Sequence, residues 1–91
     1  MSEVRDNQSE CRFELAEDGA LAFAKYLQEG DAIVFTHTIV PEEVEGRGVG
    51  GRLVKGALDL VRDRGLAVVP NCSFVRSYIE RHPEYRDLVA G

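Results

Sequence analysis

The stretch VEGRGVGGR at residues 44–52 decides the fold of this chain. It holds four of the nine glycines, with an apolar run before it at residues 32–40 and a helical pattern after it at residues 49–64. Glycines let a backbone approach a ligand closely, and the unpaired N–H groups in the first turn of a helix point toward an anion. The sequence therefore predicts a strand, a glycine turn and a helix that together bind a ligand carrying phosphate.

Two further elements and a short turn are expected after this helix. A wholly apolar run at residues 66–69 is typical of a buried strand. Either Ser73 or Asn71 then suits the N-cap of a second helix that runs to about Arg81, and residues 83–88 add one short turn. The strand before the glycines, the first helix and the next strand form a β-α-β unit, whose strands should be parallel or splayed neighbours.

The first third of the chain reads as an antiparallel meander. Apolar side chains alternate over residues 9–15, which predicts a strand with Cys11 in the core. A weaker alternation over residues 20–26 suggests a second strand, although this segment could also be helical. Residues 33–40 are rich in β-branched side chains and form the strongest strand. Residues 1–8 are expected to be frayed.

The order of elements is therefore β-β-β-α-β-α, which indicates an α/β fold with a mixed sheet and helices packed on it. We expect the 91 residues to form one small domain, as a monomer or a homodimer. Two cysteines and a polar N-terminus favour a reducing, cytoplasmic location. No apolar run is long enough to span a bilayer, so no membrane partner is expected.

The charge is unevenly spread along the chain. The formal net charge is −5, which argues against a nucleic-acid partner. Residues 1–45 carry three basic and eleven acidic side chains, whereas residues 46–91 carry eight basic and five acidic ones. This imbalance indicates either a positive field for an anionic ligand near the glycines or a chance difference between solvated surfaces.

Two well-known phosphate motifs fit the glycines poorly. GRGVGG at residues 46–51 matches the spacing of the dinucleotide fingerprint, but three strands precede it and Asn71 stands where an acidic residue is needed. The Walker loop requires Lys and Ser or Thr after the last glycine, where this chain has Arg52 and Leu53. Scattered Cys and His residues show no zinc spacing, so no metal site is expected.

A third phosphate loop matches better. EGRGVG at residues 45–50 resembles the acyl-CoA pyrophosphate loop of the GNAT superfamily of N-acetyltransferases, whose pattern is Arg or Gln, two residues, Gly, one residue, and Gly or Ala. The segments VPEE at 40–43, VPNCSF at 69–74 and YIERHPEY at 78–85 resemble the short, single-domain branch of that superfamily. The resemblance covers residues 35–85 and implies a minimal GNAT-like fold.

The resemblance implies acetyl-CoA as the bound cosubstrate. Glu45 departs from the family pattern, and its carboxylate would repel phosphates unless Arg47, Arg52 and Lys55 offset it. The residues implied in binding acetyl-CoA are those of the loop and two at the start of the second helix: Glu45, Gly46, Arg47, Gly48, Val49, Gly50, Gly51, Asn71 and Phe74.

Cys72 is the first catalytic candidate. It lies at the start of the second helix, where the helix N-terminus favours the thiolate, and the short GNAT branch carries a cysteine in this context. It could act as the general acid for the departing CoA thiolate or as a transient acyl acceptor. The alternative is a small buried apolar residue without a chemical role.

His37 and Tyr78 are the other catalytic candidates. His37 is mid-strand, and a period of two places it on the face of Phe35 and Ile39. It could deprotonate the amine, a role for which Glu42 and Glu43 are alternatives. In the larger family a tyrosine on the second helix can protonate the thiolate, which makes Tyr78 a secondary candidate.

The predicted function is transfer of an acetyl group from acetyl-CoA to an amine, either a small molecule or a protein. Two alternatives remain open: a non-catalytic acyl-CoA binding or sensing module, and a small nucleotide-binding protein. Binding of CoA without turnover would favour the first, and binding of NAD or ATP the second.

Overall fold

The computed structural model describes residues 3–90. Its elements confirm the α/β fold class and the strand–glycine turn–helix order. In chain order they are strands β1 (Arg5–Asn7), β2 (Arg12–Glu17), β3 (Ala20–Glu29) and β4 (Ala32–Ile39), the 3₁₀ turn η1 (Glu42–Val44), helix α1 (Val49–Asp63), strand β5 (Ala67–Pro70), helix α2 (Ser73–Arg81) and the 3₁₀ turn η2 (Pro83–Leu88).

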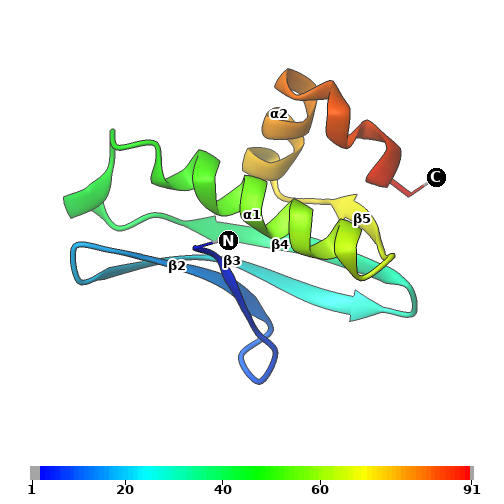
Figure 1. Cartoon of the computed structure of the whole chain (residues 1–91), viewed down its shortest axis with the longest axis horizontal. Coiled ribbons are helices and arrows are strands. Elements are labelled where there is room, and N and C mark those ends of the chain that lie inside the picture. Colours follow the sequence, from blue (N-terminus) through cyan, green and yellow to red (C-terminus); the bar gives the residue numbers. More distant parts are fainter. Residues whose placement is uncertain (1–2, 91) are drawn as a thin grey trace.

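The five strands form one mixed sheet in the order β1-β2-β3-β4-β5. The first four are antiparallel, and β4 pairs with β5 in parallel. Both helices lie on the same side of the sheet, with α1 running along it and α2 above β5 (Figure 1). We call the sheet face turned away from α1 the outer face. No element of residues 3–90 covers it in Figure 1.

The core lies between α1 and the inner face of the sheet. Alternation in β2 and β3 sends one set of side chains toward α1, as period two requires. The ring of Phe13 packs 5.0 Å from that of Tyr26 and 5.7 Å from that of Phe35, centroid to centroid. From α1, the buried apolar residues are Val49, Leu53, Val54, Ala57, Leu58 and Val61. No helix within residues 3–90 has the length and apolar character needed to cross a bilayer.

Two expectations for the N-terminal region are wrong. Residues 5–7 are not frayed but form β1, and Val4 before them is buried, whereas residues 1 and 2 lie outside the described part of the chain. Cys11 is exposed rather than in the core. Cys11 lies in the turn between β1 and β2, where it has a positive φ of 54°. The strand expected from residue 9 therefore begins only at Arg12, after this turn.

Short segments occupy both edges of the sheet. On one side β1 has three residues, all polar or charged. On the other side Val89 forms a parallel bridge with Val68 of β5, and the N–H of Ala90 donates to the carbonyl of Val68 at 2.9 Å. The C-terminal segment therefore lies beside β5.

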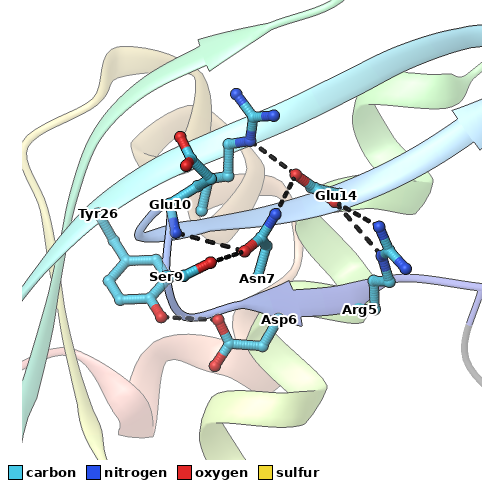
Figure 2. Close-up of polar contacts among 8 residues, drawn as sticks. Arg5, Asp6, Asn7, Ser9, Glu10, Glu14 and Tyr26 are labelled. Atoms are coloured by element: carbon cyan, nitrogen blue, oxygen red, sulfur yellow. Dashed lines mark hydrogen bonds and ion pairs between the residues drawn. The ribbon is translucent and has the colours of Figure 1, made fainter.

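Glu14 is a buried carboxylate on the outer face of β2, with 2% of its area exposed. It accepts hydrogen bonds from Arg12 Nε at 2.7 Å, Asn7 Nδ2 at 2.9 Å and Arg5 Nη2 at 3.1 Å (Figure 2). The hydrogen bond from Arg12 is the main cause of a lowered pKa for Glu14. β1 is therefore attached to β2 by a charged cluster as well as by its backbone.

Glu14→Gln should lower the free energy of unfolding at pH 7 by about 1–3 kcal/mol, because two arginines lose their carboxylate partner. The folded pKa of Glu14 is lowered, so its stabilising contribution is complete above the ordinary glutamate pKa and is lost as pH falls toward the lowered folded value. Urea unfolding at pH 7 and pH 3.5 measures both effects. The two proteins should differ less in stability at pH 3.5. Glu10→Gln, an equal charge change at an exposed turn residue, is the control; an equal loss in both variants would contradict the prediction.

Candidate active site

The glycine stretch forms a left-handed turn that leads into α1. Gly46 and Gly48 have φ angles of 81° and 73°, and Gly48 is the N-cap of the helix. A side chain at such φ angles is strained, so glycine is the residue that suits both positions. The predicted strand, glycine turn and helix start at Val49 are confirmed.

The first turn of α1 leaves backbone donors free. The first helical hydrogen bond runs from the N–H of Arg52 to the carbonyl of Gly48 at 3.1 Å. The N–H groups of Val49, Gly50 and Gly51 therefore have no acceptor within the helix, and no side chain caps it. They lie at a cavity of about 340 Å³ whose wall includes Gly46 and Gly48. We call this cavity the cradle; its donors and the helix dipole suit an anion.

Phe74 of α2 forms the opposite wall of the cradle. A Cβ built on Gly50 would lie 2.5 Å from Phe74 Cζ, so glycine is needed there for the ring to pack against α1. The structure thus brings together two of the predicted binding residues from different helices. Asn71, predicted with them, does not line the cradle and is exposed.

The cations near the cradle already have carboxylate partners. Arg47 pairs with Asp18, and its side chain does not line the cradle. Arg52 lies 3.0 Å from Glu3 and 3.1 Å from Glu17, and Lys55 lies 3.0 Å from Asp59. Glu45 is among the residues that line the cradle, and its carboxylate makes no hydrogen bond or ion pair with any residue in the range 3–90. These cations therefore compensate less than the sequence suggests for the repulsion between the Glu45 carboxylate and a bound phosphate.

β4 and β5 separate beside the cradle. Their parallel pairing runs from Ala32 opposite Ala67 to Phe35 opposite Pro70 and then ends. β4 continues to Ile39, whereas the chain after β5 turns into α2. The backbone of residues 36–39 therefore has an edge with no paired strand beside it, which provides hydrogen-bonding groups for an extended ligand.

Cys72 lies at this separation. It is the N-cap of α2, so neither Ser73 nor Asn71 takes the capping position as predicted. Its side chain is buried, and its Sγ lies 3.3 Å from Thr38 Oγ1 of β4, within hydrogen-bonding distance. The thiol therefore sits between the unpaired part of β4 and the start of α2.

His37 lies on the other side of β4. A bulge places Phe35 opposite Tyr26 but His37 opposite Lys25, so Thr36 is an extra residue in β4 and the alternation shifts there. His37 is consequently exposed on the outer face, and the prediction that it shares the face of buried Phe35 is wrong.

His37 opens into a cavity on the outer face of about 510 Å³. Its wall combines residues of the β1–β2 turn with residues of β3 and β4, among them Glu10, Cys11, Lys25 and Thr36. The His37 ring is held by a contact of 3.2 Å between its Nδ1 and Thr36 Oγ1. The thiol and the imidazole predicted as catalytic groups thus flank the same strand from opposite faces.

Tyr78 is buried between α1 and α2, and this burial raises its pKa. Its ring stacks on His82 with a centroid distance of 3.9 Å and an interplanar angle of 15°. It lines a cavity between the two helices rather than the cradle. Of the cradle residues, Gly51 and Phe74 also line this cavity, so Tyr78 lies next to the cradle but not in its wall.

Comparison with known proteins agrees with this geometry. A family model described as GCN5-related N-acetyl-transferase matches residues 12–88. Protein NATD1 from Homo sapiens is 32% identical over 80 residues, which span 87% of this chain and 69% of that protein. Protein NATD1 from Mus musculus is 32% identical over 77 residues, or 84% and 68% of the two chains.

One solved structure is similar to this chain in both sequence and fold. The solution structure of a GCN5-like protein from Staphylococcus aureus superposes with a TM-score of 0.73 at 32% identity, covering 100% of this chain and 92% of that one. This chain therefore belongs to the GCN5-related N-acetyltransferase family, whose general chemistry is acetyl transfer.

Proposed function

We propose that this protein is an N-acetyltransferase that uses acetyl-CoA and transfers the acetyl group to an amine. The observation that carries the proposal is the cradle, in which three backbone N–H groups without helical acceptors meet a glycine-lined cavity of about 340 Å³. Acetyl-CoA would supply an activated thioester. Its pyrophosphate suits these donors because they need no side chain and leave room for two phosphates.

The separation of β4 and β5 supports binding of the rest of the donor. The pantetheine arm is extended and carries two amides, which match the unpaired backbone edge at residues 36–39. That edge leads from the cradle toward the bulge at Thr36, so the thioester would lie beside Cys72 and Thr38.

Cys72 is proposed as the group that serves the leaving sulfur. When the amine nitrogen bonds to the acetyl carbon and the C–S bond breaks, the sulfur needs a proton, and the Cys72 thiol can donate it while Thr38 orients the Sγ–H. Transient acylation of Cys72 is the other route, and an acetylated Cys72 found by mass spectrometry would identify it. Tyr78 stays a secondary proton donor, since its raised pKa keeps it protonated.

The acceptor amine is proposed to approach from the outer face. There His37 opens into a cavity of about 510 Å³ and can take the ammonium proton before attack. No helix of residues 3–90 covers this face, and Leu21, Leu27 and Ile39 are exposed on it. An open face admits a protein amine as readily as a small one.

The proposal also covers domain organisation, location and oligomeric state. We propose one domain that acts in the cytoplasm, since both Cys11 and Cys72 are free thiols. A monomer or a homodimer suits its size.

A ligand panel followed by a turnover assay tests the proposed function. Acetyl-CoA and CoA should raise the melting temperature, whereas NAD and ATP should not, and free CoA should appear when an amine panel is added. Stabilisation by NAD or ATP alone would indicate a nucleotide-binding protein. Stoichiometric acetyl-CoA binding without turnover, unchanged in Cys72→Ala, would indicate a binding module instead.

Glu45→Arg should tighten acetyl-CoA binding about fivefold, because it replaces an unpaired carboxylate in the cradle wall with a cation that can meet phosphate. The gain should shrink as salt is raised. Isothermal titration calorimetry at two salt concentrations measures both. Glu43→Arg makes the same charge change at an exposed residue outside the cradle wall. An equal gain in both variants would show that the long-range field, and not the cradle, is responsible.

A further inference from the structure

The cavity of about 510 Å³ on the outer face, which we call the outer-face cavity, has a well-anchored wall. That wall is the β1–β2 turn, where Asn7 Oδ1 accepts hydrogen bonds from Ser9 Oγ at 3.0 Å and from the N–H of Glu10 at 3.3 Å (Figure 2). The carbonyl of Cys11 accepts a further hydrogen bond from the N–H of Tyr26 at 2.9 Å, which fixes the turn to β3. All these bonds are made within the protein, so the turn needs no ligand to hold it in place.

Two opposite charges line the outer-face cavity without pairing. They are the carboxylate of Glu10 and the ammonium of Lys25. Neither makes a hydrogen bond or an ion pair with another residue in the range 3–90. Their formal charges cancel, so a polyamine or a dianion would leave one of them uncompensated. A ligand that carries one ammonium and one carboxylate matches both.

Lys25 stands next to the proposed base. The antiparallel register of β3 and β4 pairs Lys25 directly with His37, and both are exposed in the outer-face cavity. Side chains paired in this way have Cβ atoms about 4.5–5.5 Å apart. In an α-amino acid the nitrogen and the carboxylate are bonded to the same carbon, so a nitrogen at His37 brings the carboxylate to Lys25. Leu27, with 54% of its area exposed, adds apolar surface for the rest of such a ligand.

We propose that the acceptor is a free α-amino acid, whose carboxylate binds Lys25 while Glu10 attracts its ammonium and His37 takes the proton. The inference rests on the proposed function. The deprotonated nitrogen bonds to the acetyl carbon, the C–S bond breaks, and the sulfur leaves as the thiol of CoA, with one proton released to solvent overall. The product is an N-acetyl amino acid. It has lost its positive charge, so Glu10 no longer attracts it, which favours its release.

Acetyl transfer to the common amino acids and to their decarboxylated counterparts tests the inference. The wild-type protein should acetylate at least one amino acid. Lys25→Gln should lower kcat/KM for that amino acid about tenfold, through a higher KM, because one charge-assisted contact is lost. The counterpart without the carboxylate should change less than about threefold. Because the two amines differ in intrinsic reactivity, each is compared between the two proteins and not with the other amine.

Two further variants serve as controls for Lys25→Gln. Lys25→Arg keeps the positive charge and should retain most of the activity toward the amino acid. Arg86→Gln is an equal charge change on η2, outside the outer-face cavity, and should affect neither substrate. Thermal unfolding of each variant confirms that the fold is retained.

The other outcomes separate the two proposals. Transfer only to amines without a carboxylate, or only to protein lysines, would overturn the inference and leave the proposed function standing. An equal loss for both substrates in Lys25→Gln would also overturn it, because Lys25 would then not act on the carboxylate. Stoichiometric acetylation of Lys25 itself, found by mass spectrometry, would overturn it too, since the lysine would be the acceptor. Transfer to no acceptor of any kind would defeat the proposed function itself.

Discussion

Cys72→Ala should lower the rate of acetyl transfer about a hundredfold while the affinity for acetyl-CoA stays within about threefold of wild type. The thiol lies at the start of α2, 3.3 Å from Thr38 Oγ1, beside the unpaired edge of β4 rather than in the cradle. Removing it takes away the proton source for the leaving sulfur but none of the backbone donors that hold the pyrophosphate. Single-turnover kinetics and titration calorimetry measure the two effects separately.

Two further variants serve as comparisons for Cys72→Ala. Cys72→Ser keeps a hydrogen-bonding group beside Thr38 but is a weaker acid, so its rate should fall between those of wild type and the alanine variant. Cys11→Ala removes the other thiol, which is exposed in the wall of the outer-face cavity and away from Thr38, and should change the rate less than about threefold. Full activity in Cys72→Ala would mean that the residue is only part of the core.

Gly48→Ala should weaken acetyl-CoA binding by at least about tenfold. Gly48 has a φ of 73° at the N-cap of α1, where a side chain costs about 1–2 kcal/mol. A Cβ at this position meets no protein atom within 4 Å, and Gly48 lines the cradle, so the new methyl group would occupy space that is open next to the ligand site. The variant both crowds the ligand and redirects the donors of Val49 and Gly50.

Gly30→Ala is the matched control for backbone strain. Gly30 has a φ of 60° in the turn between β3 and β4, and its Cβ would also meet nothing within 4 Å. That turn lies at the end of β4 opposite the cradle. Thermal unfolding should show similar destabilisation of the two variants, and only Gly48→Ala should lose affinity. Equal affinities would mean that the ligand does not bind at the start of α1.

Elements set by local pattern could be predicted from the sequence. The helix expected at residues 49–64 is α1 at Val49–Asp63, and the strand expected at residues 66–69 is β5 at Ala67–Pro70. In both, the spacing of apolar residues, together with glycine or proline, determines the element within a few positions. The parallel pairing of β4 with β5 also agrees with one of the two expected arrangements.

Features that depend on distant partners could not be predicted. β1 has no apolar alternation, and it is held by Glu14 and by the hydroxyl of Tyr26, which donates to Asp6 at 2.6 Å from twenty residues away. From the sequence, Glu14 would be assigned to the solvent-exposed face of a strand. It is buried in the folded protein because the side chains of Arg5 and Arg12 pack around it.

In the candidate site, too, features that depend on distant partners could not be predicted from the sequence. Resemblance to a family identified Cys72, but its neighbour Thr38 lies 34 residues earlier and faces it only because the bulge shifts the alternation of β4. That bulge arises from pairing with β3, so period two along β4 alone assigned His37 to the wrong face. The ion pairs of Arg47 and Arg52 with N-terminal carboxylates likewise depend on the folded arrangement.

The two edges of the sheet bear on how this protein behaves at high concentration. Strand edges with free N–H and C=O groups recruit other chains and start aggregation. Here one edge is a charged strand of three residues, and residues 89–90 lie along the other. The unpaired backbone of β4 lies instead inside the sheet, where α2 begins beside it. The free backbone groups offered to a ligand are thus kept apart from the outer edges of the sheet, both of which end in short segments.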